Sequence, residues 1–316
     1  MKLLVLGAGA VGGYFGGRLV EAGGDVTFLV RPQRAATLKA NSLVIKSPAG
    51  DTRLPVKTIG ATEEAGPFDL ILLACKAYDL DAAIEAVTPH VMKNGAIVLP
   101  LLNGMAHIDR LHDTFGEAQV IGGTCQIGAT MSPDGEILHF DLLARLSFGT
   151  FEDQPNAGEL DGLLSEFATL VAKANFSGRR VEPIDQSIWD KWVMLATLAG
   201  MTTLMRAGVG DILHTREGDE LVEEFLHEAI GVAEESGYPP SPEFLATARK
   251  VLFDRNSTLM ASMLRDIEKG SPIEAEHLIG DMYGRAHEFG IDATLLRLAY
   301  CHLQSYEARR KREAKS

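Results

Sequence analysis

The feature that most constrains this fold is a glycine-rich turn near the N-terminus, Gly7-Ala8-Gly9-Ala10-Val11-Gly12, which matches the pattern G-x-G-x-x-G. It follows the apolar run Leu3–Leu6 and opens a helical pattern at Val11–Ala22. In that context, the first glycine permits the tight turn and the second lets the backbone approach a pyrophosphate. The third lets the helix pack on the strand, and the N–H groups of the helix start face the phosphates. The motif therefore predicts a dinucleotide-binding domain, with an ordinary strand–helix turn as the alternative.

The first half of the chain alternates between apolar runs and helical patterns, whereas the second half is almost entirely helical. Uninterrupted apolar runs predict buried strands of a parallel sheet at residues 3–6, 26–30, 70–74 and 96–101. Strands near residues 119–130 and 136–150 are expected to extend this sheet. The pattern predicts an α/β fold, with an N-terminal Rossmann-type doubly wound parallel sheet and an all-helical C-terminal domain. We place the dinucleotide-binding domain at residues 1–180 and the helical domain, with the substrate and catalytic residues, at residues 181–316.

Charge and cysteine content narrow the class of protein. The 316 residues include 30 Lys and Arg against 43 Asp and Glu, a net charge of −13, which argues against a protein that follows nucleic-acid phosphates with a basic face. The three cysteines, Cys75, Cys125 and Cys301, lie far apart, which favours a reducing cytoplasm over a disulfide framework. No uncharged apolar run approaches the ~18 residues of a membrane span. We therefore expect a cytoplasmic protein with a small-molecule partner and no nucleic-acid or membrane partner, and the sequence is compatible with a homodimer.

The residue at the end of the second strand selects between the two nicotinamide dinucleotides. An NAD site usually has Asp or Glu there for the ribose 2′-hydroxyl, whereas an NADP site often has Arg for the 2′-phosphate. This chain has Arg31 at that position, with Arg34 close by and no acidic side chain between them. The sequence therefore predicts NADP(H), and a solvated surface arginine is the alternative.

Polar residues follow two of the predicted strands, at the edge where an open parallel sheet binds its ligands. Lys76 follows the strand at residues 70–74, and Asn103 follows the strand at residues 96–101, so both are candidate contacts for cofactor or substrate. In the helical half, Lys191 precedes a long stretch without any charge. A lysine held in a cleft can act as a general acid, and a surface lysine paired with an aspartate is the alternative.

A metal site is a further alternative. Glu224-x-x-His227 and Glu274-x-x-His277 both have the E-x-x-H spacing of di-iron bundles. That site also needs two glutamates from other helices of a four-helix core, and a dinucleotide-binding fold in front makes such a core improbable. We therefore predict no metal ion.

In their order along the chain, these motifs resemble those of the ketopantoate reductase (2-dehydropantoate 2-reductase) family over nearly the whole length. The likeness rests on the glycine turn and on Arg31, Cys75-Lys76-Ala77, Asn103-Gly104-Met105, Gly123-Thr124 with Ala129, Trp189-Asp190-Lys191, Ser262-Met263-Leu264-Arg265-Asp266-Ile267 and Glu274. The resemblance implies an oxidoreductase that uses NADPH to reduce the 2-oxo acid ketopantoate to the 2-hydroxy acid pantoate in pantothenate biosynthesis. It also implies an active site in a cleft between the two domains.

The resemblance assigns a role to each matched residue. Lys191 matches the family's catalytic lysine, and Asn103 matches an asparagine at both cofactor and substrate. Glu274 matches a cleft glutamate, expected to assist catalysis, and Ser262 matches a substrate contact. The expected cofactor contacts are Gly7, Ala8, Gly9, Ala10, Val11, Gly12, Arg31, Lys76, Asn103, Ala129 and Glu274.

The chain departs from the family at four positions where its best-characterised members carry asparagine. The residues here are Leu195, Ala199, Val209 and Leu259. In the resembled enzymes these amides help to grip the hydroxylated substrate, so their replacement leaves a less polar pocket. The substrate is therefore either ketopantoate or another 2-oxo acid or imine, and a non-catalytic NADP-binding sensor is the alternative from a different class.

Overall fold

The computed structural model describes residues 1–63 and 65–314. These residues form two compact units. The sheet unit comprises Met1–Leu102 and His107–Asp185, and the helical unit comprises Asn103–Ala106 together with the chain from Gln186 onward. The expected domain boundary, between residues 180 and 181, falls within the last segment of the sheet unit.

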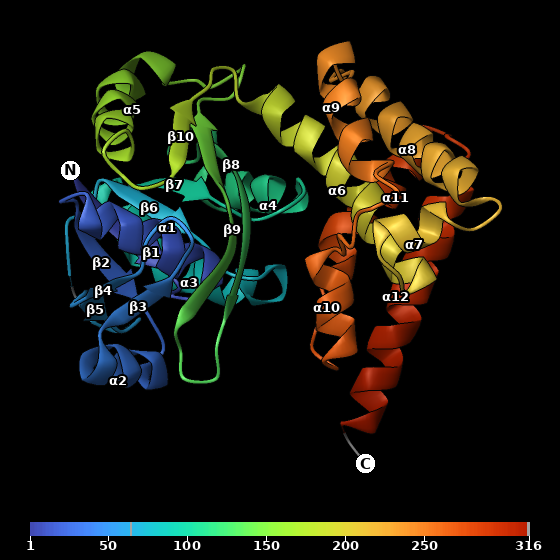
Figure 1. The fold of residues 1–316 in the computed structure, drawn as a ribbon. Coiled ribbons are helices and arrows are strands. Elements are labelled where there is room, and N and C mark those ends of the chain that lie inside the picture. Colours follow the sequence, from blue (N-terminus) through green and yellow to red (C-terminus); the bar gives the residue numbers. More distant parts are fainter. Residues whose placement is uncertain (64, 315–316) are drawn as a thin grey trace. The chain divides into compact units, whose positions relative to one another are not determined.

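The sheet unit is built on five parallel strands in the order β5-β2-β1-β6-β7 (Figure 1). Their bounds are β1 (Lys2–Leu6), β2 (Asp25–Leu29), β5 (Lys57–Ile59), β6 (Leu70–Leu73) and β7 (Ile97–Pro100). The helices that connect or flank them are α1 (Ala10–Glu21), α2 (Pro32–Asn41), η1 (Ala77–Asp79), α3 (Leu80–Asn94), α4 (Ala106–Phe115), η2 (Glu117–Gln119) and α5 (Ala157–Val171). The strand order reverses between β1 and β6, and such a switch point is where doubly wound sheets bind their ligands.

Both faces of this sheet are buried, as its uninterrupted apolar strands predict. Leu3 and Val5 of β1 belong to the core on one face, with Phe15 of α1. Leu4 and Leu6 belong to the core on the other face, with side chains of α3. Because successive strand side chains point to opposite faces, a strand with no polar residue needs apolar cover on both sides. The predicted α/β fold class is confirmed.

A second sheet corrects one expectation. Its strands are β3 (Leu43–Lys46), β4 (Thr52–Leu54), β8 (Gly122–Met131), β9 (Ile137–Gly149) and β10 (Ser177–Arg180), in the order β10-β9-β3-β4 with β8 paired to β9. The prediction that residues 119–130 and 136–150 extend the first sheet is therefore wrong, and a single bridge, Val98 to Val120, links this segment to β7. The reason is that β8 and β9 pair with each other along most of their length, and their apolar side chains enter the same core as Leu3 and Val5.

The helical unit is organised around α6 (Asp185–Met205), which passes between α8 and α10 in the view of Figure 1. The other helices are α7 (Val209–Leu213), α8 (Gly218–Glu235), α9 (Pro242–Leu252), α10 (Ser262–Glu268), the π-helix η3 (Glu276–Gly280), α11 (Asp281–Glu288) and α12 (Thr294–Glu313). Most of α6 is buried, as expected of a helix whose last 13 residues, Val193–Met205, carry no charge.

In two stretches of the second half, the helices are shorter than their helical sequence patterns predict. The pattern at residues 273–308 predicts one helix, but the chain turns at Gly290, whose φ of +72° is a conformation that favours glycine. The pattern at residues 256–269 yields a helix only from Ser262 onward. No helix among the described residues is long and apolar enough to cross a membrane.

Candidate active site

The glycine turn has the geometry that a bound pyrophosphate requires. Gly7 adopts a φ of +92°, and a Cβ at Gly12 would lie 2.2 Å from the Gly7 carbonyl oxygen and 2.9 Å from the Ala74 Cβ. Both positions therefore need glycine. At Gly9, in contrast, a Cβ would meet no atom within 4 Å, so the space beside the start of α1 is open. No side chain caps α1, and its first turn carries no acidic residue to oppose a phosphate. The residues present fit a dinucleotide.

The structure brings together two segments that follow β2 and β6, the strands on either side of β1. Arg31 follows β2 and is 77% exposed, and its guanidinium Nη2 lies 2.8 Å from Asp79 Oδ1. Asp79 ends the short helix η1, which Lys76 precedes at the end of β6. Arg34, in contrast, is bonded to the backbone. Its Nε donates to the Ala8 carbonyl at 3.0 Å, and its Nη1 donates to the Gly135 carbonyl at 2.8 Å. Of the two arginines, Arg31 therefore presents the exposed cation at this edge.

Ala129, the remaining predicted cofactor contact of the sheet unit, lies on β8. It pairs with His139 of β9 just after a register shift between Ile127 and Ala129. Such an irregularity redirects the side chains of a strand. The contact of Ala129 with a cofactor stays a prediction.

Lys191 and Asn103 are brought together within the helical unit. The Lys191 Nζ donates a hydrogen bond to Asn103 Oδ1 over 2.8 Å, and Lys191 is half-buried on α6. Because an ammonium group can only donate, the amide oxygen must face it, and the Asn103 NH₂ group is then directed elsewhere as a donor. Gly104 makes this placement possible, since it has a φ of +81° and a Cβ there would lie 2.7 Å from the His277 carbonyl oxygen.

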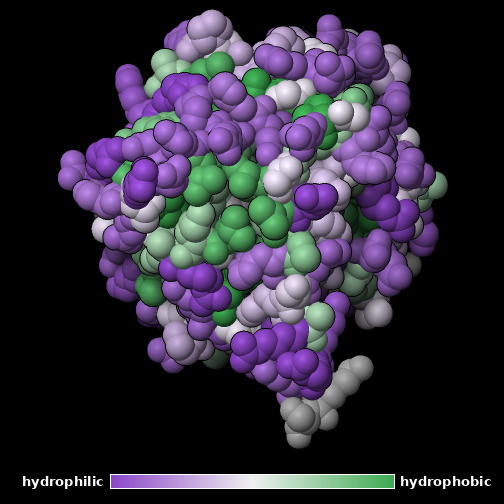
Figure 2. Space-filling model, turned by 90° about the vertical axis from the view of Figure 1, so that its right-hand side faces the viewer, coloured by the Kyte–Doolittle hydropathy of each residue, from purple (hydrophilic) through white to green (hydrophobic). Residues whose placement is uncertain are grey.

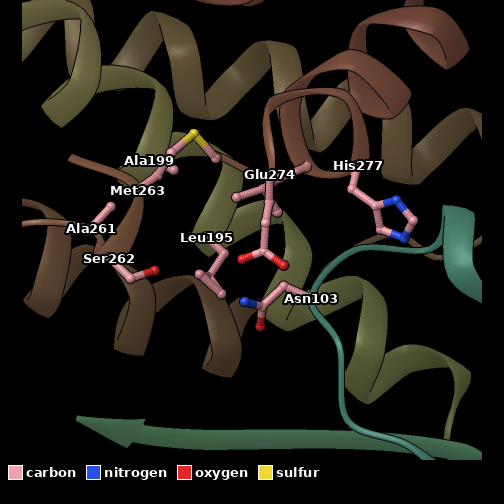
Figure 3. A pocket seen from close by; sticks show the side chains of 9 residues that line it. Asn103, Leu195, Ala199, Ala261, Ser262, Met263, Glu274 and His277 are labelled. Carbon is pink, nitrogen blue, oxygen red and sulfur yellow. The ribbon is translucent and has the colours of Figure 1, made fainter. Parts of the chain in front are cut away.

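Asn103 also lines a pocket of the helical unit, whose empty volume of about 340 Å³ includes space open to solvent. The pocket is lined by Asn103, Leu195, Ala199, Ala261, Ser262, Met263, Glu274, His277 and Leu278. Figure 3 shows the Glu274 carboxylate and the Asn103 amide pointing toward one another. Three predicted site residues, Asn103, Ser262 and Glu274, thus share one pocket, and Lys191 is bonded to one of them.

The π-helix η3 contributes pocket residues for which we predicted no role in such a site. It carries His277 and Leu278, and the Trp192 Nε1 donates to the Leu278 carbonyl over 3.0 Å. Burial lowers the pKa of His277, against the opposing effect of Glu274, so the imidazole is neutral at pH 7. Single-turn π-helices often occur at functional sites. The E-x-x-H spacing drew attention to His277, but only as a possible metal ligand.

The two E-x-x-H motifs lie in different surroundings. Glu274 and His277 line the pocket, whereas His227 is exposed on α8 and pairs with Glu223 at 2.9 Å. Among residues 1–63 and 65–314, no cluster of three or more His, Cys, Asp or Glu side chains is placed to hold a metal ion.

Comparison with known proteins identifies the family. The model of ketopantoate reductase PanE/ApbA matches residues 3–153, and the model of its C-terminal domain matches residues 183–307. A Bacillus subtilis relative, described as the uncharacterized oxidoreductase YkpB, is 37% identical over 98% of this chain and 99% of its own. The chain belongs to the ketopantoate reductase family. It is therefore an NAD(P)-dependent oxidoreductase of the 2-oxo acid reductase class.

Solved structures share the fold of this chain. The 2-dehydropantoate 2-reductase from Geobacter metallireducens has a TM-score of 0.85 and 26% identity, covering 96% of this chain and 99% of its own. A D-mandelate dehydrogenase, solved with NADH and anilino(oxo)acetate, has a TM-score of 0.86 and 19% identity, covering 98% and 100%. A dimeric ketopantoate reductase from Staphylococcus aureus, at 23% identity, has a TM-score of 0.77 over 98% and 100% of the two chains.

The four positions at which the resemblance leads us to expect asparagine fall into two groups. Leu195 and Ala199 both line the pocket, on successive turns of α6. Val209 and Leu259 are outside the lining set, and the Val209 N–H donates to the Leu259 carbonyl at 3.0 Å. Two of the four positions therefore lie in the wall of this pocket.

Proposed function

We propose that this ketopantoate reductase relative reduces a 2-oxo acid to the 2-hydroxy acid with NADPH, using Lys191 as the general acid. The observation that carries the proposal is the 2.8 Å hydrogen bond from Lys191 Nζ to Asn103 Oδ1, at the wall of a pocket that also holds Glu274 and Ser262. The family name suggests 2-dehydropantoate as the substrate and pantoate, in pantothenate biosynthesis, as the product.

The chain's own groups supply binding and proton transfer. When bound, the cofactor supplies a hydride to the substrate carbonyl carbon. Lys191 donates a proton to the carbonyl oxygen, so that the C=O group gains H⁻ and H⁺ and becomes CH–OH. The Asn103 NH₂ group, directed away from Lys191, is available to donate to the same oxygen or to the cofactor. Ser262 would contact the substrate carboxylate. The Glu274 carboxylate would balance the positive charge of Lys191.

Residues of both units would hold the cofactor. In the sheet unit these are the glycine turn, Arg31, Lys76 and Ala129, and in the helical unit they are Asn103 and Glu274. Support for NADP over NAD comes from the exposed Arg31 guanidinium at the end of β2 and from the lack of a carboxylate in the Arg31–Arg34 segment. The mandelate dehydrogenase of the same fold was solved with NADH, so the choice requires a direct test.

The decisive experiment is a steady-state assay of NADPH and NADH oxidation with a panel of 2-oxo acids, including 2-dehydropantoate. Turnover of at least one 2-oxo acid with NADPH is expected. If the protein binds NADPH but oxidises it with none of them, the non-catalytic sensor becomes the better explanation. If an imine is reduced in preference to every 2-oxo acid, the substrate class is wrong.

We also propose that the protein is a cytoplasmic homodimer. The cytoplasm is supported by the three cysteines, which form no disulfide among the residues described. For the dimer, Figure 2 shows apolar side chains gathered on one face, and the helical unit exposes Met205, Leu259, Phe289 and Leu298 by 36 to 49%. Exposed apolar patches commonly mark protein contacts. Light scattering at micromolar concentration should give the mass of two chains, and the mass of one chain would refute the dimer.

A further inference from the structure

We propose that the substrate carries a branched, unhydroxylated apolar chain on its 2-oxo acid group. This inference rests on the proposed function and names the substrate class of the same pocket. It would make 2-dehydropantoate, with its terminal hydroxyl, a poor substrate for this chain.

The pocket has an apolar wall, which we define as Leu195, Ala199, Ala261 and Met263. Three of these residues are nearly inaccessible to water, with exposures of 1% for Ala199, 6% for Ala261 and 4% for Met263. In Figure 3 they gather on one side of the pocket, opposite His277. The four side chains of the wall offer no hydrogen-bond donor, but Ser262, between Ala261 and Met263, places its hydroxyl on the same side in Figure 3.

The polar groups that face Lys191 lie away from Ala199, Ala261 and Met263. In Figure 3, Asn103 and Glu274 lie in the centre, beside Leu195, and His277 lies farther to the right. Because Lys191 is bonded to Asn103, the proton donor lies with these polar groups. A 2-oxo acid whose carbonyl meets Lys191 and Asn103 therefore directs the rest of its carbon chain toward the apolar wall.

The threonine hydroxyls of α6 are occupied by its own backbone. Thr197, Thr202 and Thr203 are fully buried, and each donates to the carbonyl four residues earlier, over 2.9, 2.7 and 2.6 Å. Thr202 also accepts from the Ala261 N–H at 3.4 Å. These hydroxyls are therefore engaged and do not replace the amide groups that Leu195 and Ala199 lack.

The proposed function uses the Ser262 hydroxyl for the substrate carboxylate. A further substrate hydroxyl held against the apolar wall would therefore lose its hydrogen bonds with water and gain none from the wall side chains. An apolar pocket disfavours a substrate that differs only by an added hydroxyl by about 100-fold at most. Ala199 presents only a methyl group to the pocket, and Met263 is the kind of flexible side chain that adapts to the shape of an apolar group. The wall thus suits a branched aliphatic chain.

The test compares two substrates that differ by one hydroxyl, 2-dehydropantoate and its deoxy analogue 3,3-dimethyl-2-oxobutanoate. We expect kcat/KM of the wild type to be about 10- to 100-fold higher for the deoxy analogue. A ratio below ten, or a preference for 2-dehydropantoate, overturns the inference while leaving a 2-oxo acid reductase in place. If neither compound nor any other 2-oxo acid is reduced, the proposed function itself fails.

Two variants test whether the apolar wall causes the preference for the deoxy analogue. Leu195→Asn keeps the branching at Cγ and adds an amide, so it should lower the substrate ratio by about tenfold. Met92→Asn makes a similar change on α3 of the sheet unit, where Met92 is 67% exposed, and should leave the ratio unchanged. If Leu195→Asn folds and leaves the ratio unchanged, or if Met92→Asn lowers it equally, the apolar wall does not set the preference. If Leu195→Asn fails to fold, the wild-type ratio still decides.

Discussion

Replacing Lys191 gives the sharpest test of the proposed chemistry. A positioned general acid contributes about 10²–10⁴-fold to rate. Since each tenfold in rate is about 1.4 kcal/mol, Lys191→Ala should raise the barrier by roughly 3–5 kcal/mol. The same change removes the donor to Asn103 Oδ1 at 2.8 Å, and one lost hydrogen bond should lower the free energy of unfolding by only about 0.5–1.5 kcal/mol. The effect on kcat should therefore exceed the effect on stability.

The Lys191→Arg variant separates the role of Lys191 as proton donor from its hydrogen bond to Asn103. A guanidinium keeps the positive charge and can still donate to the Asn103 oxygen, but it does not release its proton at neutral pH. We expect stability near that of the wild type and kcat nearly as low as in Lys191→Ala. Binding of NADPH, measured by fluorescence titration, should barely change in either variant, because the glycine turn belongs to the sheet unit.

Steady-state kinetics with any accepted 2-oxo acid provide the measurement, and urea denaturation provides the stability. Small primary amines added to Lys191→Ala should restore part of the rate by supplying the missing acid. A loss of kcat below about threefold in Lys191→Ala, or an arginine variant as active as the wild type, would refute the assignment of Lys191 as the acid.

Three further predictions concern the choice of cofactor, the hydrogen bond from Trp192 to the π-helix η3, and an ion pair on the surface. Arg31 should favour NADPH over NADH by roughly tenfold to a hundredfold, and Arg31→Ala should abolish most of that preference in titrations with both cofactors; equal wild-type affinities would contradict the NADP assignment. Trp192→Phe leaves the Leu278 carbonyl without its 3.0 Å donor and should lower the free energy of unfolding by about 1–3 kcal/mol in urea, so an unchanged value would show that this bond is dispensable. Arg249 lowers the pKa of Glu223, so this carboxylate stabilises the fold above its unfolded pKa and loses that effect as pH falls through the lowered folded pKa. Glu223→Gln should therefore destabilise by about 0.5–1 kcal/mol at pH 7, a difference that shrinks below about pH 4, and a difference that grows in acid would exclude this linkage.

The parallel sheet and its ligand-binding edge could be predicted because they depend on local patterns. Strands such as 70–74 are apolar throughout. The rule that ligands bind at the carboxyl ends of parallel strands is enough to predict Lys76 and Asn103 as ligand contacts. The partner of β9 could not be predicted in this way. An apolar pattern indicates a strand, but the choice of neighbour depends on tertiary packing.

The pocket shows the same limit. Lys191 was ambiguous in isolation, and its bond to Asn103 joins residues 88 positions apart, a contact that no local pattern contains. His277 enters the pocket through the π-helix η3, which is held by a hydrogen bond from Trp192 on α6. The family resemblance suggested roles for these residues, and the roles themselves stay predictions.

The membership of Asn103–Ala106 in the helical unit has a consequence for chimeric proteins. This segment is encoded within the first third of the chain, between stretches that belong to the sheet unit. A fusion that joins residues 1–185 of this chain to the helical half of a relative would pair its own Asn103 with a foreign lysine. A chimera that keeps Asn103 with the lysine of the same protein therefore has to transplant residues 103–106 as well, so the candidate active site is encoded in two separate pieces of the gene.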